Sequence, residues 1–286
     1  MSHFVVHKYG SSVLSDEEQL GAVVDSIYGS VRQGERVVVV VSAMGDTTDI
    51  LLNEARRFGE DVDANALATF LSTGELRSAS LLTFALGRAG IAAAMMDAGA
   101  IELRTDGDVL DAEPLSVNAE AIEGVLRSAS VLVVPGFVGR GREGQTTLLG
   151  RGGSDLTALF IAAELGARCV LYKDVDGIYE ADPNRTAGLV RRYVTMSWQA
   201  ARDVGGKVIQ DKAVSFAEAR ALDFTVQSLG KSGGTRIGRF FDELTSHEDT
   251  LRPLKVVLLG LGTVGLGVYR RLREQPDSFE VVSIAV

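Results

Sequence analysis

One run of apolar residues, Arg36–Val41, constrains the fold more than any other feature of the chain, because it reads RVVVVV. A continuous β-branched run is typical of a strand buried on both faces, and such strands occur in parallel sheets covered by helices. Helical spacing of apolar residues flanks the run, at Asp16–Val31 before it and at Ala64–Leu86 after it. The sequence therefore predicts an α/β fold: a three-layer αβα sandwich with a mostly parallel central sheet.

Further apolar runs alternate with helical patterns along the chain. We expect strands at Phe4–Val6, Gly90–Met96, Val131–Val134, Cys169–Tyr172 and Phe224–Ser228, an irregular section at Ala98–Leu110, and helices at Asp49–Phe58, Ser116–Ser128, Leu156–Leu165, Val194–Val204 and Lys212–Leu222. Four strands end in glycine-rich, small-residue or acidic turns, at residues 8–12, 42–48, 135–139 and 173–177. Crossovers of one hand bring such turns to one edge of the sheet, so a shared site is expected there.

Composition narrows the class of protein. The chain has 286 residues, of which 46% are apolar, so it can hold one large or two ordinary domains. The formal charge of −9 and the scattered basic residues argue against a nucleic-acid partner. The apolar runs are too short to cross a bilayer and the N-terminus lacks a secretory pattern, so we expect a cytoplasmic protein with no membrane partner. Cys169 is expected as a buried thiol, and the three histidines predict no transition-metal site.

The stretch from Thr146 to Pro183 carries the first sign of chemistry. Its glycine-rich turn, Gly150–Gly153, precedes a helical pattern, and a helix N-terminus is suited to bind an anion. An acidic turn, Lys173–Gly177, follows the next strand, where α/β sheets place a nucleotide or its metal. The chain has neither a P-loop nor the protein-kinase motifs, so we interpret the stretch as half of a different kind of phosphoryl-transfer site.

Each candidate residue has a plainer alternative. Lys8, at a strand end, is either a phosphate-binding cation or a solvated lysine. Arg151 suits bidentate carboxylate or phosphate binding, but it is also typical of a surface turn. Ser154 and Asp155 stand where a helix cap is expected. Glu75 is either part of a site or an exposed helix residue, and Asp174 with its neighbours could simply shape a turn.

Six ordered motifs between residues 4 and 237 resemble those of the amino-acid kinase family, and of its aspartate kinases in particular. They are Lys8-Tyr9-Gly10-Ser11-Ser12, Val41–Thr48 (VSAMGDTT), Ser72-Thr73-Gly74-Glu75, Thr147–Asp155 (TLLGRGGSD), Asp174–Pro183 (DVDGIYEADP) and Gly206-Lys207-Val208-Ile209. The resemblance implies the amino-acid kinase fold. It also implies transfer of a phosphoryl group from ATP, with Mg²⁺, to the side-chain carboxylate of L-aspartate, the first step of lysine, threonine and methionine biosynthesis.

The resemblance also implies roles for individual residues. Lys8 and Asp155 would be catalytic; Ser42, Thr48, Glu75, Arg151, Ser154 and Asp155 would bind the amino acid; and Lys8, Gly10, Ser11, Lys173, Asp174, Tyr179, Asp182 and Lys207 would bind the nucleotide. No metal ligand is assigned among the protein's residues. The attacking group is already a carboxylate, so positioning and charge neutralisation should suffice. The resemblance implies at least a homodimer, although such contacts usually involve regulatory ACT domains.

Three departures from the family pattern leave other interpretations open. Ser11 stands in place of a glycine, Lys173 in place of a threonine, and Gln210-Asp211-Lys212 in place of H-P-R. A serine at the first position would be costly if the backbone there needs a positive φ or a close approach to phosphate. One alternative is a related kinase acting on another carboxylate, a carbamate or a phosphonate. Another is a weakly active nucleotide-binding or assembly domain.

A second pattern begins after a charged linker. We expect a kinase domain at 1–238, a linker at 239–252 and a partial Rossmann β-α-β unit at 253–286. The unit contains Gly260, Gly262 and Gly265 as G-x-G-x-x-G between a strand and a helix, and it resembles the start of homoserine dehydrogenase. We therefore expect a truncated piece of a bifunctional enzyme without an ACT domain. NAD(P) would bind only in a hypothetical full-length dehydrogenase domain, and no dehydrogenase activity is expected from this chain.

Overall fold

The computed structural model describes residues 4–59, 61–183, 185–186, 190–206, 208–231, 233–246, 254–273 and 279–285. The chain forms two compact units, Met1–Tyr179 with Tyr193–Glu243, and Glu180–Arg192 with Leu244–Val286. Among the described residues, no helix is both long and apolar enough to cross a membrane.

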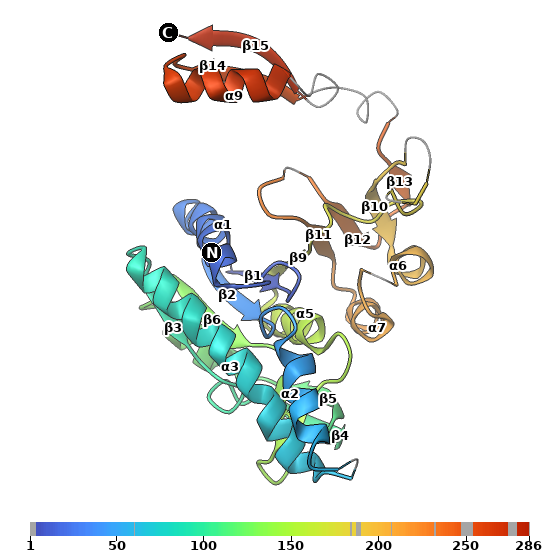
Figure 1. Ribbon diagram of the computed structural model, residues 1–286. Helices are drawn as coiled ribbons and strands as arrows, with labels where there is room; N and C mark the ends of the chain where they lie inside the picture. Colours follow the sequence, from blue (N-terminus) through green and yellow to red (C-terminus); the bar gives the residue numbers. More distant parts are fainter. Residues whose placement is uncertain are drawn as a thin grey trace. The chain divides into compact units, whose positions relative to one another are not determined.

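A nine-stranded sheet forms the centre of the first unit (Figure 1), with the order β13-β10-β12-β11-β9-β1-β2-β6-β3 among the described strands. The bounds are β1 Phe4–Tyr9, β2 Arg36–Val41, β3 Ala93–Met95, β6 Val131–Pro135, β9 Arg168–Tyr172, β10 Tyr193–Ser197, β11 Phe224–Gln227, β12 Thr235–Gly238 and β13 Glu243–Leu244. Strands β1, β2, β3, β6, β9 and β11 pair in parallel, and β11 pairs antiparallel with β12. The predicted, mostly parallel α/β sandwich is confirmed.

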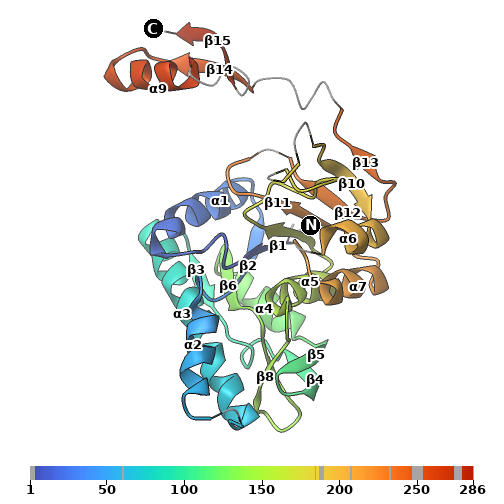
Figure 2. The ribbon, with the colours of Figure 1, turned by 45° about the vertical axis from the view of Figure 1, so that its right-hand side comes forward.

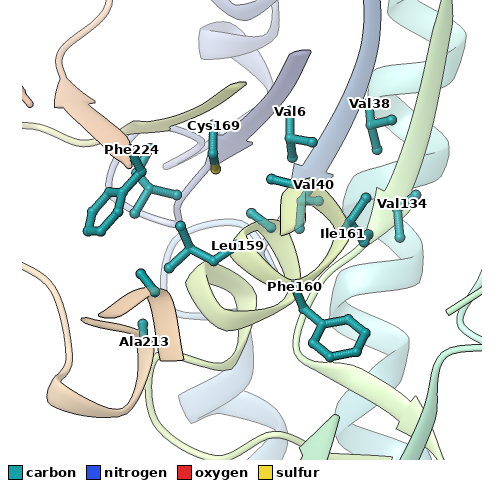
Figure 3. Close-up of a cluster of buried hydrophobic side chains, with 14 of the residues drawn as sticks. Val6, Val38, Val40, Val134, Leu159, Phe160, Ile161, Cys169, Ala213 and Phe224 are labelled. Atoms are coloured by element: carbon teal, nitrogen blue, oxygen red, sulfur yellow. The ribbon is translucent and has the colours of Figure 1, made fainter. Parts of the chain in front are cut away.

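Helices cover both faces of this sheet. The bounds are α1 Leu20–Arg32, α2 Thr47–Arg56, α3 Ala64–Arg88, α4 Ala119–Leu126, α5 Gly153–Leu165, α6 Trp198–Gly205 and α7 Asp211–Ala219, with a 3₁₀ turn at Glu17–Gln19. One core packs α1 and the second half of α3 against alternate strand residues such as Val37 and Val39. The other packs α4, α5 and α7 against Val38 and Val40. Figure 3 shows Leu159 and Ile161 of α5 in this core. The valine run is therefore buried on both faces, as its sequence predicts.

Helix α5 is the most enclosed element of the unit. Its first ten residues, Gly153–Ala162, are all buried, which explains why its sequence has no polar face. It packs on β1 and β9 on one side and on α7 on the other. This enclosure fixes the N-terminus of α5 at the carboxyl edge of the sheet.

A smaller sheet contradicts part of the sequence-based prediction. Its order is β5-β4-β7-β8, with β4 Arg104–Asp108, β5 Asp111–Ser116, β7 Val138–Arg140 and β8 Thr146–Leu148. It lies at the same end of the unit as α2 (Figures 1 and 2). The prediction of an irregular section at Ala98–Leu110 was wrong for β4, whose polar residues show no apolar alternation and whose order comes from pairing with β5 and β7.

The second unit contains a β-α-β element, described by itself. Strands β14 Leu254–Leu259 and β15 Phe279–Ala285 pair in parallel, and α9 Thr263–Arg273 packs against both. Gly260 has φ +89°, and a Cβ on Gly265 would collide with the carbonyl oxygen of Gly260. These two positions therefore require glycine, for the tight turn and for the close approach of helix to strand.

Candidate active site

Strand β1 places Lys8 inside the protein at the edge of the sheet. Val5 and Tyr9 point to the core formed with α1 and α3, whereas Lys8 faces α5, because successive strand side chains alternate. The strand continues to Tyr9, so the prediction that it ends after Val6 was wrong. Lys8 is only 5% exposed, and the solvated alternative is therefore excluded.

Asp155 joins two lysines at the N-terminus of α5. Its Oδ1 lies 2.7 Å from Nζ of Lys8 and its Oδ2 lies 2.6 Å from Nζ of Lys173, and all three side chains are largely buried. Burial lowers the pKa of Lys8, and the Asp155 carboxylate opposes this. Burial alone would raise the pKa of Asp155, but the two ammonium groups outweigh it and hold that pKa below 3.8. The cluster of two cations and one anion has a net positive charge.

The glycine-rich turn before α5 presents Arg151 to solvent. Gly150 and Gly152 on either side have φ +70° and +75°, a region that side chains rarely adopt. Arg151 is exposed, and in the described part of the chain it has no hydrogen-bond or ion-pair partner. Ser154, one residue after Gly153, is 8% exposed and packs beneath Gly136, where a Cβ would lie 3.0 Å from the Cα of Ser154. The turn therefore leaves one cation available beside the buried cluster.

Helix α3 carries a buried carboxylate. Glu75 is 3% exposed, so the exposed-helix alternative is excluded; the backbone N–H of Ala43 donates to its Oε1 at 3.3 Å. Its Oε2 has no hydrogen-bond partner among the described residues. Burial raises the pKa of Glu75 to about 7. Ser42 lies beside Ala43 at the end of β2, and Thr48 lies in the first turn of α2.

Gly10 lies against Lys8, and the turn after β1, which contains Ser11, contacts the turn after β9. A Cβ on Gly10 would lie 2.9 Å from Nζ of Lys8, so a glycine leaves room for the ammonium group. Ser12 donates to Asp174 Oδ1 at 3.2 Å, which links the two turns. The non-glycine residues with positive φ in the described part are Glu102, Phe137 and Ala221. Ser11 is not among them, so this serine carries no cost from a positive φ.

The remaining predicted nucleotide residues are only partly placed. Tyr179 donates to Asp176 Oδ1 at 2.8 Å, at the end of the same turn as Asp174. Asp182 lies in the second unit, where its carboxylate is 3.5 Å from Nε of Arg185. Lys207 lies outside the described residues. The structure thus groups Lys8, Asp155 and Lys173, and it links the turn of Asp174 to that of Ser12.

The fold and this cluster can be compared with known proteins. A model described as the amino acid kinase family matches residues 3–228. The chain belongs to this family. It is 38% identical over 230 residues to an aspartokinase of Thermus thermophilus, covering 78% of this chain and 56% of that protein. An aspartokinase of Helicobacter pylori is 33% identical over 238 residues, with 82% and 58% covered. The chain thus spans a little over half the length of these relatives.

Solved structures show the same amino acid kinase fold. The aspartate kinase of Synechocystis has a TM-score of 0.72 at 29% identity, over 83% of this chain and 40% of that one. E. coli aspartokinase III in complex with aspartate and ADP has a TM-score of 0.73 at 23% identity, over 86% and 66%. At that identity the second likeness supports the fold alone.

Proposed function

We propose that this chain transfers the γ-phosphoryl group of ATP to the side-chain carboxylate of L-aspartate, giving 4-phospho-L-aspartate and ADP. The observation that carries the proposal is the buried Lys8–Asp155–Lys173 cluster, set between the Arg151 turn and the Asp174 turn. Phosphoryl transfer needs cations at the oxygens of the transferred group and little covalent help from the protein. The aspartokinase relatives favour aspartate as the acceptor, and amino-acid biosynthesis as the setting.

The cluster would act by neutralising charge. Lys8 would contact the transferred phosphoryl group, and Asp155 would hold Lys8 and Lys173 in place between the two substrates. Lys173 would neutralise phosphate charge on the nucleotide side. The aspartate side chain attacks as a carboxylate, so no general base is required, and catalysis would rest on alignment and charge.

The two substrates would occupy opposite sides of the cluster. On one side, Arg151 would pair with the α-carboxylate of aspartate and Glu75 with its ammonium group, supported by Ser42, Thr48 and Ser154. On the other side, Gly10, Ser11, Asp174 and Tyr179 would bind the nucleotide, while a nucleotide-binding role for Asp182 and Lys207 rests on the resemblance alone. Arg151 is exposed, and Glu75 Oε2 is buried without a partner among the described residues, so both groups are available to a ligand.

Mg²⁺ would enter this site with ATP. Among the described residues, no three acidic, histidine or cysteine side chains converge to hold a metal, and both Asp155 oxygens face lysines. With so few protein ligands, Mg²⁺ would be bound mainly by phosphate oxygens and water, and Asp174 would be the acidic side chain at the nucleotide turn. The ion would neutralise phosphate charge.

The reaction itself is tested by trapping the acyl phosphate. Incubation with aspartate, ATP and Mg²⁺ in hydroxylamine should give aspartyl hydroxamate, with ADP formed in equal amount. Glutamate, carbamate and a phosphonate serve as alternative acceptors in the same assay. Product with another acceptor but not with aspartate would move the proposal to a related kinase. ATP binding without turnover on any acceptor would support a nucleotide-binding domain instead.

Glu75 gives a prediction that depends on pH. Its folded-state pKa of about 7 is raised above the ordinary 4.5, so its contribution to stability is present below pH 4.5 and is lost as the pH rises through about 7. Glu75→Gln should therefore raise the free energy of unfolding at pH 8 by up to about 3 kcal/mol, with a much smaller gain at pH 5. Urea denaturation at both pH values measures this difference.

The same variant should weaken the binding of aspartate, because glutamine has no charge and cannot form an ion pair with the ammonium group of the substrate. The Michaelis constant for aspartate should rise while that for ATP stays constant. Glu54→Gln, on the exposed face of α2, is the matched control and should change neither stability nor either constant. An equal stability gain at pH 5 and pH 8 would show that the charge of Glu75 is not the cause.

We propose that the β14–α9–β15 element is a dinucleotide-binding unit of the homoserine dehydrogenase type. The glycine requirements at Gly260 and Gly265 support this, together with Gly262 between them. NAD(P) would bind with its pyrophosphate at the N-terminus of α9. This element is the reason for proposing that the chain derives from a bifunctional aspartate kinase–homoserine dehydrogenase. Catalysis of hydride transfer needs further residues than this element offers, so the kinase reaction is the activity proposed for the chain.

A further inference from the structure

Lys212, in the first turn of α7, is surrounded by oxygen atoms. Its Nζ lies 2.8 Å from Asp111 Oδ1, 3.0 Å from Glu113 Oε1, and 3.1 Å from the carbonyl oxygens of Ala112 and Leu149. An ammonium group has three protons, so these four acceptors use its full donor capacity. Three of these acceptors belong to residues of β5, and the fourth is the carbonyl oxygen of Leu149, the residue directly before the Arg151 turn. Lys212 therefore joins three segments that are far apart in the sequence.

The contacts of Lys212 reach the Arg151 turn itself. Asp111 bridges with Leu149 as an isolated β-bridge, and a Cβ on Gly150 would collide with the Oδ1 of Asp111. The carboxylate that binds Lys212 is thus packed against the first glycine of the turn. Displacement of this carboxylate would leave Gly150 unsupported on that side.

The beginning of α7 supports the second glycine in the same way. A Cβ on Gly152 would lie 2.7 Å from the Cβ of Gln210, which occupies the N-cap position of α7 two residues before Lys212. Both glycines that flank Arg151 therefore rest on groups held by the start of α7. The Gln210-Asp211-Lys212 segment, which departs from the family pattern, is part of the support of the site.

We propose that Lys212 is a positioning residue, which fixes the Gly150–Gly153 turn and so aims Arg151 at the α-carboxylate of the amino-acid substrate. The inference rests on the proposed function, in which Arg151 binds that carboxylate. An arginine between two glycines has little restraint of its own, since glycine adds backbone freedom. The ammonium group of Lys212 restricts the backbone of the turn through its contacts with Asp111 and with the carbonyl oxygen of Leu149. It acts on substrate binding and leaves the Lys8–Asp155–Lys173 cluster untouched.

A structural alternative makes a different prediction. Asp111 and Glu113 are more than half exposed, and exposed ion pairs contribute little to stability. If Lys212 served only to attach α7 to β5, its loss would affect folding and both substrates alike. The contact with the Leu149 carbonyl instead predicts an effect confined to the amino-acid substrate.

Steady-state kinetics of Lys212→Met and Lys212→Arg separate these two cases. Lys212→Met should raise the Michaelis constant for aspartate on the order of tenfold, the size expected for loss of one hydrogen bond to a charged group. The turnover number and the constant for ATP should stay within about twofold, and Lys212→Arg should restore most of the loss. The matched control is Arg220→Met, because Arg220 attaches the opposite end of α7 to Glu164 of α5. A fall in turnover number with unchanged aspartate affinity would overturn the proposal.

A double-mutant cycle tests whether Lys212 acts through Arg151. In an Arg151→Ala background, Lys212→Met should have less than about a twofold further effect, because the group it positions is gone. An undiminished effect would contradict the proposal. Amide hydrogen exchange of the peptide 146–155 should be faster in Lys212→Met and normal in Lys212→Arg, and it is measured without substrate. If no acceptor is phosphorylated, the proposed function fails, yet unchanged exchange alone would still reject the role of Lys212.

Discussion

The Lys8→Ala variant should retain at most about a thousandth of the wild-type turnover number, the scale of effect seen when a charge-stabilising group is removed from a transition state. Lys8 is the cation that β1 holds at the carboxyl edge of the sheet, and its ammonium group lies against Asp155. Lys173 cannot take its place, since it occupies the second oxygen of Asp155. The affinity for ATP should change only modestly, because several other groups are proposed to bind the nucleotide.

Hydroxamate formation under saturating substrates measures this loss, and equilibrium binding of ATP measures the remaining affinity. Lys8→Arg should not rescue activity, because the space beside Gly10 fits an ammonium group and the longer guanidinium would meet that backbone. Lys255→Ala, on the exposed side of β14, is the matched lysine control and should behave as the wild type. An unchanged turnover number in Lys8→Ala would remove Lys8 from the reaction.

The parts of the fold that were predictable are those encoded by local pattern. The Arg36–Val41 run was recognised as a strand buried on both faces, since only that environment suits a continuous β-branched sequence. Likewise Leu156–Leu165 was predicted as a helix, and it lies within α5. In both cases, neighbouring residues alone carry the information.

Elements that depend on distant partners were missed or misassigned. Val194–Val204 was predicted as one helix, but β10 occupies Tyr193–Ser197 and α6 begins at Trp198. Ser197 caps the helix by accepting from Ala200 N–H, and the residues before it are ordered by parallel pairing with β12. Phe224–Ser228 was predicted as a strand, but β12, which follows it as an antiparallel neighbour, was not predicted. Pairing between segments as far apart in the sequence as β10 and β12 leaves little mark on either of them.

The candidate site shows the same division. Glycine-rich and acidic motifs identify which residues are involved, but they do not reveal which side chains meet. Lys173 was assigned to nucleotide binding from its place in the acidic turn, but its contact with Asp155 could not be predicted from the sequence. Lys212 was noted only as a departure from a family pattern, because its charge and its place at the start of a helix gave no sign of Asp111 or Glu113. Such contacts come from three-dimensional packing.

Asp155→Asn should lower the free energy of unfolding at pH 7 by on the order of 3 kcal/mol, because it leaves two buried ammonium groups facing each other without a counter-charge. Lys173→Met in the same chain should recover part of this loss by removing the repulsion. Lys173→Met alone keeps the Lys8–Asp155 pair and should cost less than Asp155→Asn. Urea denaturation of the wild type, both single variants and the double variant measures the coupling.

The pH dependence separates this charge effect from a packing effect of the same substitution. The pKa of Asp155 is below its ordinary 3.8 in the folded protein, so its stabilisation is present above that pH and is lost as the pH falls through the folded-state pKa. The stability difference between the wild type and Asp155→Asn should therefore be constant from pH 5 to pH 7 and narrow below pH 3.8. If the stability difference between the wild type and Asp155→Asn persisted below pH 3.8, the loss of stability would come from the changed packing of the side chain at position 155 and not from its charge. Without the Asp155 carboxylate, the already lowered pKa of Lys8 falls further. Lys8 then loses its proton at a lower pH than in the wild type. As the pH is raised, the remaining activity of Asp155→Asn should therefore disappear at a lower pH than the activity of the wild type.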